Sequence, residues 1–215
     1  MNFPDTLAPR LLEGRLALIT GAGQGNGRTI ALGLAQAGAR VIVTDLNAST
    51  VDETASAIRQ AGGQAWSYVL DVTQADDCHA LAARVADEVG QVDLLVNNAG
   101  IIIRETTSSP RAAANWKKTI DVNVHGTFNV THAWLDAVKA TRGCVINIAS
   151  IAAYAGQAAS LGYAPSKGAI KMLTQSLAQE LAPAGVRVNA LAPGVIATPM
   201  TCLLYTSDAA DEGLG

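Results

Sequence analysis

Few of the side chains in this sequence are charged, aromatic or thiol-bearing. Charged residues make up 15% of the chain and aromatic residues 4%, whereas 49% of the residues are hydrophobic. This composition excludes an intrinsically disordered chain, which needs low hydrophobicity and high charge. Lys and Arg number 15 against 18 Asp and Glu, without a basic run. An electrostatic nucleic-acid-binding surface is therefore not expected.

Long apolar runs are also missing. No uncharged apolar stretch approaches the roughly 18–20 residues that a membrane-spanning helix needs, and the first 15 residues lack the apolar segment of a secretory signal. The three cysteines are far apart and the three histidines lack a zinc-motif spacing, so neither a disulfide framework nor a metal site is predicted. We expect structural or surface roles for the histidines, and a cytoplasmic protein with no membrane partner.

Short β-branched runs alternate instead with longer alanine-rich amphipathic stretches, a pattern typical of βαβ units. Several of the runs are apolar on consecutive residues, as expected of parallel strands that are covered on both faces. We predict one α/β domain over residues 1–201, built on a single doubly wound Rossmann-type parallel sheet. The predicted strands are 16–20, 41–45, 66–71, 93–98, 144–150 and 186–193, and the predicted helices are about 26–37, 48–61, 74–89, 111–140 and 162–182.

A glycine-rich turn follows the first predicted strand and leads into a helix. Backbone in such a turn can approach a pyrophosphate, and the helix N-terminus favours its negative charge, although a plain tight turn is the alternative. Asp45 ends the second strand, where a carboxylate can bind the adenosine ribose hydroxyls and would repel a 2′-phosphate. Leu46 and Gln24 offer that phosphate no cation, so NAD is favoured over NADP. The turn residues predicted to bind the cofactor are Gly21, Gln24, Gly25, Asn26 and Gly27.

The spacing of this turn and several later motifs resemble the short-chain dehydrogenase/reductase family. Residues 20–27 match the family's TGxxxGxG loop, and the resemblance covers about residues 14–201. The family implies hydride transfer between NAD(P) and a small alcohol or carbonyl substrate, by a homodimer or homotetramer. The later motifs are Asn97-Asn98-Ala99-Gly100, Asn123, Ser150, Tyr163-Ala164-Pro165-Ser166-Lys167, and Pro193-Gly194 followed by Thr198.

The resemblance implies catalytic roles for four of these residues. Tyr163 and Lys167 are four apart on a predicted helix and share one face, and a cationic neighbour favours the tyrosinate form. Tyr163 would exchange a proton with the substrate oxygen, while Lys167 would supply the charge and bind the nicotinamide ribose. Ser150 would hold the substrate oxygen, and Asn123 would anchor a water in a proton relay. Taken singly, each has a plain structural alternative, such as a surface pair, a turn former or a helix cap.

The remaining cofactor contacts also follow from the resemblance. Asp71 and Val72 would line the adenine, and the segment Asn98, Ala99 and Gly100 would border the adenosine ribose. A later segment would close over the nicotinamide, with its last member near the phosphates. Asn26 departs from the family, which usually has isoleucine there, and a backbone contact would tolerate that change. The residues of the later segment are Pro193, Gly194, Ile196 and Thr198.

The last residues, 202–215, resemble no part of the family. They match the translation of a transposase-type sequencing adapter, and a divergent natural tail is the alternative. We therefore expect a chain that leaves the family pattern at about residue 201, before the family's last strand and helix, and ends in a non-native tail. The predicted strand 186–193 would then have an unpaired side, and Ile170, Leu173 and Leu177 would be under-covered.

Three functions remain open at this point. The first is an NAD-dependent alcohol dehydrogenase or carbonyl reductase. The second is an NADPH-preferring 3-oxoacyl-thioester reductase, against which Asp45 and Leu46 argue. The third is a catalytically silent nucleotide-binding fragment, against which the intact set of Tyr163, Lys167 and Ser150 argues.

Overall fold

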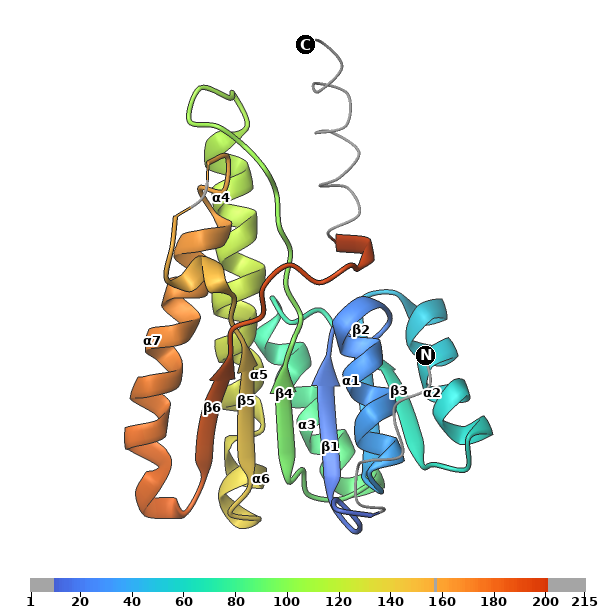
Figure 1. The fold of residues 1–215 in the computed structure, drawn as a ribbon. Coiled ribbons are helices and arrows are strands. Elements are labelled where there is room, and N and C mark those ends of the chain that lie inside the picture. Colours follow the sequence, from blue (N-terminus) through green and yellow to red (C-terminus); the bar gives the residue numbers. More distant parts are fainter. Residues whose placement is uncertain (1–9, 157, 201–215) are drawn as a thin grey trace.

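The computed structural model describes residues 10–156 and 158–200, and in these residues six parallel strands form one sheet (Figure 1). Their order across the sheet is β3-β2-β1-β4-β5-β6. The direction of winding reverses between β1 and β4, which is where doubly wound sheets bind their ligands. The predicted fold is confirmed. The strands are β1 (Leu16–Thr20), β2 (Arg40–Asp45), β3 (Ala65–Val69), β4 (Leu94–Asn97), β5 (Cys144–Ile148) and β6 (Arg187–Leu191).

Helices connect the strands, and four of the five predicted helices are found close to their predicted bounds. The prediction of one helix over 111–140 is wrong, because a π-helical turn and a break at Trp134 (φ −98°, ψ 9°) divide it. The helices are α1 (Gly25–Gln36), α2 (Ala48–Gln60), α3 (Ala75–Glu88), α4 (Ala112–Ile120), the π turn η1 (Asp121–His125), α5 (Gly126–Ala133), α6 (Leu135–Ala140) and α7 (Tyr163–Leu181), with 3₁₀ turns η2 (Ile151–Ala153) and η3 (Ala182–Ala184).

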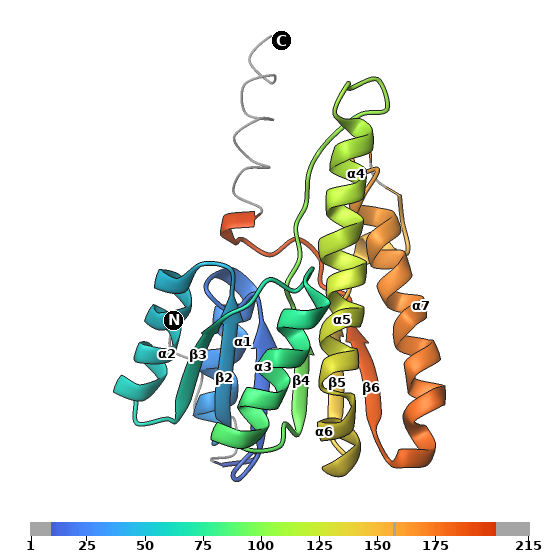
Figure 2. The same cartoon turned by 180° about the vertical axis from the view of Figure 1, so that it is seen from behind.

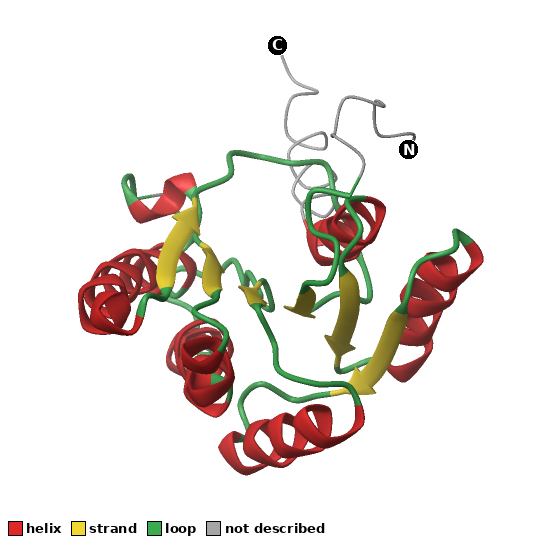
Figure 3. Cartoon of the chain, turned by 90° about the horizontal axis from the view of Figure 1, so that it is seen from below, coloured by secondary structure: helices red, strands yellow, loops and turns green. Residues whose placement is uncertain are grey.

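Two hydrophobic cores cover the two faces of the sheet. Leu16 and Leu18 of β1 pack into the core that contains α3, α5, α6 and α7, while Ala17 and Ile19 pack toward α1 and α2. This alternation follows from the period of two along a strand. Figure 2 shows α3, α5 and α6 across one face, and the view along the strands in Figure 3 shows helices on both faces.

Strand β6 has a single neighbour, β5, among the residues that the structure describes. Leu191 at its end is 53% exposed, whereas Val188 is buried on the α7 side. The expectation that Ile170, Leu173 and Leu177 would be under-covered is wrong for Ile170 and Leu177, which are 1% and 9% exposed. Leu173 is partly buried and packs against the same core. The reason is that α7 packs against β6 and η1. The predicted tail, residues 202–215, lies outside the described residues.

Two kinds of feature are absent from the described part of the chain. No helix there is long and apolar enough to cross a bilayer. No group of three or more His, Cys, Asp or Glu side chains there is placed to hold a metal ion. The thiols of Cys78 and Cys144 are buried and unbridged. Burial raises the pKa of the Cys78 thiol to about 11, so this residue behaves as part of the core.

Candidate active site

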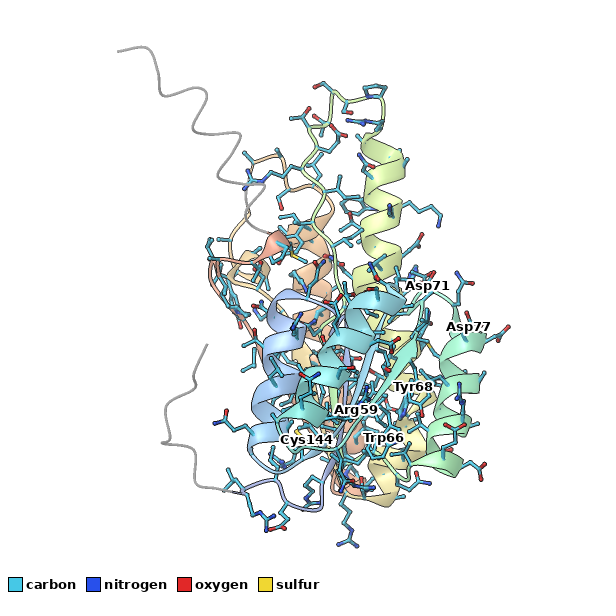
Figure 4. The ribbon with its side chains drawn as sticks, turned by 90° about the vertical axis from the view of Figure 1, so that its right-hand side faces the viewer. Arg59, Trp66, Tyr68, Asp71, Asp77 and Cys144 are labelled. Atoms are coloured by element: carbon cyan, nitrogen blue, oxygen red, sulfur yellow. The ribbon has the colours of Figure 1, made fainter. Side chains whose placement is uncertain are left out.

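A cavity of about 350 Å³ lies at the carboxyl ends of the strands and collects almost every predicted site residue. Asn123 is the exception, because it lies one layer behind the wall and is 1% exposed. In Figure 4, Asp71 lies beyond Tyr68 and Trp66 toward the carboxyl ends of the strands. The predicted residues that line the cavity are Gly21, Gln24, Gly25, Asn26, Gly27, Asp45, Leu46, Asp71, Val72, Asn98, Ala99, Gly100, Ser150, Tyr163, Lys167, Pro193, Gly194, Ile196 and Thr198.

Other residues in the wall were not singled out as cofactor contacts from the sequence. Most are apolar and follow directly on a strand or a motif, so their position in the sheet places them there. A strand position carries no chemical signature of its own, which is why the sequence did not reveal them. They are Leu70, Ile101, Val122, Ile148, Ala149, Pro199 and Met200.

The glycine-rich turn packs so closely on itself that side chains are excluded. A Cβ atom on Gly27 would lie 2.1 Å from the carbonyl oxygen of Gly21 and 2.5 Å from Asn98 Nδ2. Gly21 has φ +61°, and a Cβ there would lie 2.9 Å from the Cα of Ala99. The first turn of α1, which begins at Gly25, carries no acidic residue. The backbone at this helix start is therefore suited to an anionic group such as a pyrophosphate.

Side chains from β1 and β4 fix the turn in place. Asn98 Nδ2 donates to the carbonyl oxygens of Thr20 and Gly21 at 2.9 and 3.0 Å. Thr20 Oγ1 in return accepts from the backbone N–H groups of Asn98 and Ala99, both at 3.0 Å. The amide of Asn98, predicted to border the adenosine ribose, is thus engaged with the turn itself.

The carboxylate of Asp45 lies beside the turn at the end of β2. Its Oδ2 accepts from the N–H of Gly23 at 2.9 Å, and its Oδ1 accepts from the N–H of Asn47 at 3.1 Å. A carboxylate has about four acceptor sites, so both oxygens can take further donors such as ribose hydroxyls. The charged residues among the described lining residues are Asp45, Asp71 and Lys167, which puts negative charge at this end of the cavity.

Tyr163 opens α7, and Lys167 lies one turn later at the other end of the cavity. Lys167 Nζ lies 5.7 Å from the centroid of the Tyr163 ring and donates a 2.6 Å hydrogen bond to the carbonyl oxygen of Ile148. Lys167 is 6% exposed. Burial lowers the pKa of its ammonium group from 10.5 to about 8. This group can therefore gain and lose a proton close to neutral pH beside the tyrosine.

Ser150 lies directly after β5 and caps the short turn η2. Its Oγ accepts from the N–H of Ala152 at 3.1 Å, and the residue is 8% exposed. Because the oxygen acts as an acceptor in this bond, its hydroxyl hydrogen can still donate into the cavity. Ser150 is thus placed to hold an oxygen atom on the same side of the cavity as Tyr163 and Lys167.

Behind the wall, Asn123 joins three segments of the chain. Its Nδ2 donates to the carbonyl oxygen of Ile101 and to Ser166 Oγ, both at 2.9 Å, and its Oδ1 accepts from the N–H of Ile101 at 2.8 Å. Ser166 Oγ donates in turn to the carbonyl oxygen of Tyr163 at 2.6 Å. Both Asn123 and Ser166 are fully buried. The side chain of Asn123 thus fixes the cavity wall to the start of α7.

Ser166 was not predicted as a site residue, although it lies inside the matched segment 163–167. Its hydroxyl bridges the backbone of Tyr163 and the amide of Asn123. The spacing of three residues from Tyr163 on a helix was a usable signal, since it allows a side-chain hydroxyl to reach back to the preceding turn. The partner Asn123, 43 residues away, gave no such signal.

A family model described as short chain dehydrogenase matches residues 15–208 of the chain. The 3-oxoacyl-[acyl-carrier-protein] reductase FabG of Thermotoga maritima is 38% identical over 191 residues, which cover 88% of this chain and 77% of that protein. A cyclopentanol dehydrogenase of Comamonas testosteroni is 35% identical over 192 residues, 87% of this chain and 75% of that protein.

Solved structures of dehydrogenases are also similar to this chain. A protein assigned as an NAD(P)-dependent gluconate 5-dehydrogenase from Beutenbergia cavernae, with NADP bound at low occupancy, superposes with a TM-score of 0.87 at 38% identity. The superposition covers 95% of this chain and 82% of that one. A protein assigned as a gluconate dehydrogenase from Agrobacterium tumefaciens has a TM-score of 0.86 at 36% identity, over 90% of this chain and 76% of that one.

Proposed function

Since this chain belongs to the short-chain dehydrogenase family, we propose that it transfers a hydride between NAD(H) and an alcohol or carbonyl substrate. One observation carries the proposal: Ser150, Tyr163 and Lys167 line the same cavity as the glycine-rich turn and Asp45. The glycine-rich turn, where an added Cβ would fill the space left by the glycines, fits a pyrophosphate. The carboxylate at the end of β2 fits a ribose.

Three side chains have separate roles in the proposed mechanism. A bound nicotinamide would supply the hydride acceptor or donor. The Ser150 hydroxyl would donate to the substrate oxygen and hold it beside Tyr163. Tyr163 would take the hydroxyl proton as an alcohol is oxidised, or give it back as a carbonyl is reduced. Lys167 would stabilise the tyrosinate and pass the proton on. Asn123 and Ser166 would act as positioning residues behind them.

Enzyme assays with the purified chain test this function. NAD⁺ and NADP⁺ are each offered with secondary alcohols that include gluconate, cyclopentanol and 3-hydroxyacyl thioesters, and reduced cofactor is followed by its absorbance. We expect turnover with NAD⁺. Cofactor binding without turnover on any alcohol, or on the matching ketones with NADH, would support a silent nucleotide-binding protein instead.

A second candidate, an NADPH-dependent 3-oxoacyl-thioester reductase, is favoured by the 38% identity to the Thermotoga maritima protein. The negative charge of Asp45 argues against it, because a 2′-phosphate placed beside that carboxylate would be repelled. Faster reduction of a 3-oxoacyl thioester with NADPH than with NADH would favour this second function. The homodimer or homotetramer that the resemblance implies, and the cytoplasmic location expected from the composition, stay predictions.

Replacing the acidic end of the cavity should change the cofactor preference. Asp45→Ala with Leu46→Arg removes the charge beside the ribose and adds a guanidinium that can pair with a 2′-phosphate. We expect the ratio of kcat/KM for NAD⁺ over NADP⁺ to fall by about 10²-fold or more, as two favourable electrostatic changes of about 1.4 kcal/mol each would give. Asp52→Ala, on the outer part of α2, is the matched control and should leave the ratio unchanged. Equal use of both cofactors by the unmutated enzyme contradicts the assignment.

Removing the Ser166 hydroxyl should disturb positioning more than binding. Ser166→Ala deletes the bridge between Asn123 and the start of α7, while the two hydrogen bonds between Asn123 and Ile101 remain. We expect about 1 kcal/mol less stability, the usual value of a buried hydrogen bond. We also expect kcat to fall about tenfold, with the KM for NAD⁺ nearly unchanged. Ser166→Thr, which keeps the hydroxyl, should recover part of kcat. Weaker binding of NAD⁺, seen as a higher KM with kcat unchanged, would contradict this role.

A further inference from the structure

Two histidine side chains meet on the outer surface, and neither lines the cavity. His79 lies on α3 and His132 on α5, two helices that run side by side (Figure 2). His79 Nε2 lies 3.1 Å from His132 Nδ1, although the residues are 53 apart in the sequence. The rings meet edge to face at 86°, and Phe128 stacks on the His132 ring with centroids 5.8 Å apart. The pair is thus an oriented contact between two helices.

The separation of the two nitrogens suits a metal ion. Zn²⁺–nitrogen bonds are about 2.0–2.1 Å long, so two nitrogens 3.1 Å apart would subtend about 100° at a shared ion. This angle lies between the values for octahedral and tetrahedral coordination, and imidazole is a preferred ligand of zinc, copper and nickel. We propose that His79 and His132 form a binding site for a divalent late transition-metal ion, with water completing its coordination.

Binding needs a change of tautomer in one of the two rings. In the metal-free pair, one ring donates its N–H to the bare nitrogen of the other. For both nitrogens to face an ion, the donating ring must carry its proton on its other nitrogen instead. Both side chains are exposed, so that proton can move through water and an ion can enter.

The two helices that carry the histidines are packed against each other. Asn129 Nδ2 on α5 donates to the carbonyl oxygen of Val72, just before α3, at 3.0 Å. A Cβ on Gly126 would lie 2.5 Å from Val72 Cγ2, so α5 also packs closely against the segment that leads into α3. Helices that are already packed together need not be ordered when the ion binds, which lowers the entropic cost of binding.

The charge around the pair also favours a cation. Asp76 precedes His79 by three residues on α3 and is exposed on the same helix face as this histidine. Its negative charge raises the local concentration of cations. No third protein ligand is in place in the described residues, so the site would exchange its ion readily.

The remaining histidine serves as an internal control. His125 Nδ1 lies 3.2 Å from Asp121 Oδ1, and Asp121 also pairs with Lys117. His125 ends η1, directly before α5, and is also exposed, but it has no second imidazole beside it. It should therefore contribute nothing to a two-histidine site.

Titration of the full chain with Zn²⁺ alone, without a polyhistidine tag, tests the proposal. Isothermal titration calorimetry should show one Zn²⁺ bound per wild-type chain. His79→Ala and His132→Ala should each weaken that binding about tenfold or more, because one ligand remains. His125→Ala should bind as the wild type does. Circular dichroism of each metal-free variant checks that these exposed substitutions leave the fold intact.

Thermal melting gives an independent measurement. Zn²⁺ should raise the melting temperature of the wild type and of His125→Ala in a concentration-dependent way, since a ligand that binds only the folded state stabilises it. The same concentrations should raise the melting temperatures of His79→Ala and His132→Ala much less, because their Zn²⁺ binding is weaker. The proposal is overturned if the wild type binds no Zn²⁺, if His79→Ala binds as tightly as the wild type, or if His125→Ala loses binding.

Discussion

Tyr163→Phe should lower kcat by about 10²–10⁴-fold, the usual contribution of general acid–base catalysis. The substitution keeps the ring that lies 5.7 Å from Lys167 Nζ and removes only the oxygen that would carry the proton. Cofactor affinity, measured by fluorescence titration with NADH, should stay within about twofold, because in the proposed function the turn and Asp45, at the far end of the cavity, would hold the cofactor. A large fall in kcat with little change in cofactor affinity is the result expected when a proton-transferring group is removed.

Tyr68→Phe is the matched control for this experiment. Tyr68 on β3 is 8% exposed and donates to Glu88 Oε2 at 3.0 Å, and it does not line the cavity. Its loss should cost about 1 kcal/mol of stability and leave kcat unchanged. Near-normal turnover in Tyr163→Phe would show that the proton is transferred by another group.

Lys167→Met should abolish most turnover and at the same time change how stability depends on pH. Burial lowers the pKa of the lysine from 10.5 to about 8 in the folded protein. Between these pH values the unfolded chain holds a proton that the folded chain lacks, so stability rises with pH. Below about pH 8 the wild type carries the full cost of a buried charge. The methionine variant has no such cost at any pH.

The measurement is urea denaturation of both proteins across this range. The free energy of unfolding of the wild type, minus that of Lys167→Met, should increase by about 3 kcal/mol from below pH 8 to above pH 10.5. Other titrating groups are common to both chains and cancel in the difference. Parallel curves for the two proteins would mean that the ammonium group is not desolvated. The loss of turnover is measured separately, at saturating NAD⁺, because the family resemblance implies that the lysine also binds the nicotinamide ribose.

The sheet and most of the cavity wall could be predicted from the sequence for a physical reason. Parallel strands covered on both faces appear as consecutive apolar residues, and residues that follow such strands meet at one edge of the sheet. Gly21, Asp45 and Ser150 could therefore be placed in one site, since each follows or ends a strand. Tyr163 and Lys167 were identified by the resemblance to the family's motif, and their helical spacing placed them on one face. All five line the cavity.

The contacts that the sequence did not reveal join side chains from distant segments. Asn123 and Ser166 are 43 residues apart, and His79 and His132 are 53 apart. Their approach depends on how two helices cross, which no local pattern records. The hydrogen bonds of the Asn98 side chain were also not predicted, because an amide that follows a strand can point toward a ligand or toward the neighbouring glycine-rich turn. The structure shows it bonded to Gly21 and Thr20.

The π turn η1 links the position of Asn123 to the number of residues in the segment 121–125. A π turn holds one residue more than an α-helical turn, and each residue of a regular helix adds about 100° of rotation. The wider turn therefore takes up one extra residue, and Val130 on α5 still packs into the core at 1% exposure. Deleting one residue here would restore a regular helix and leave α5 in nearly the same orientation. The deletion would remove the widened turn from which Asn123 reaches Ile101 and Ser166, so it should disturb the cavity wall more than the fold.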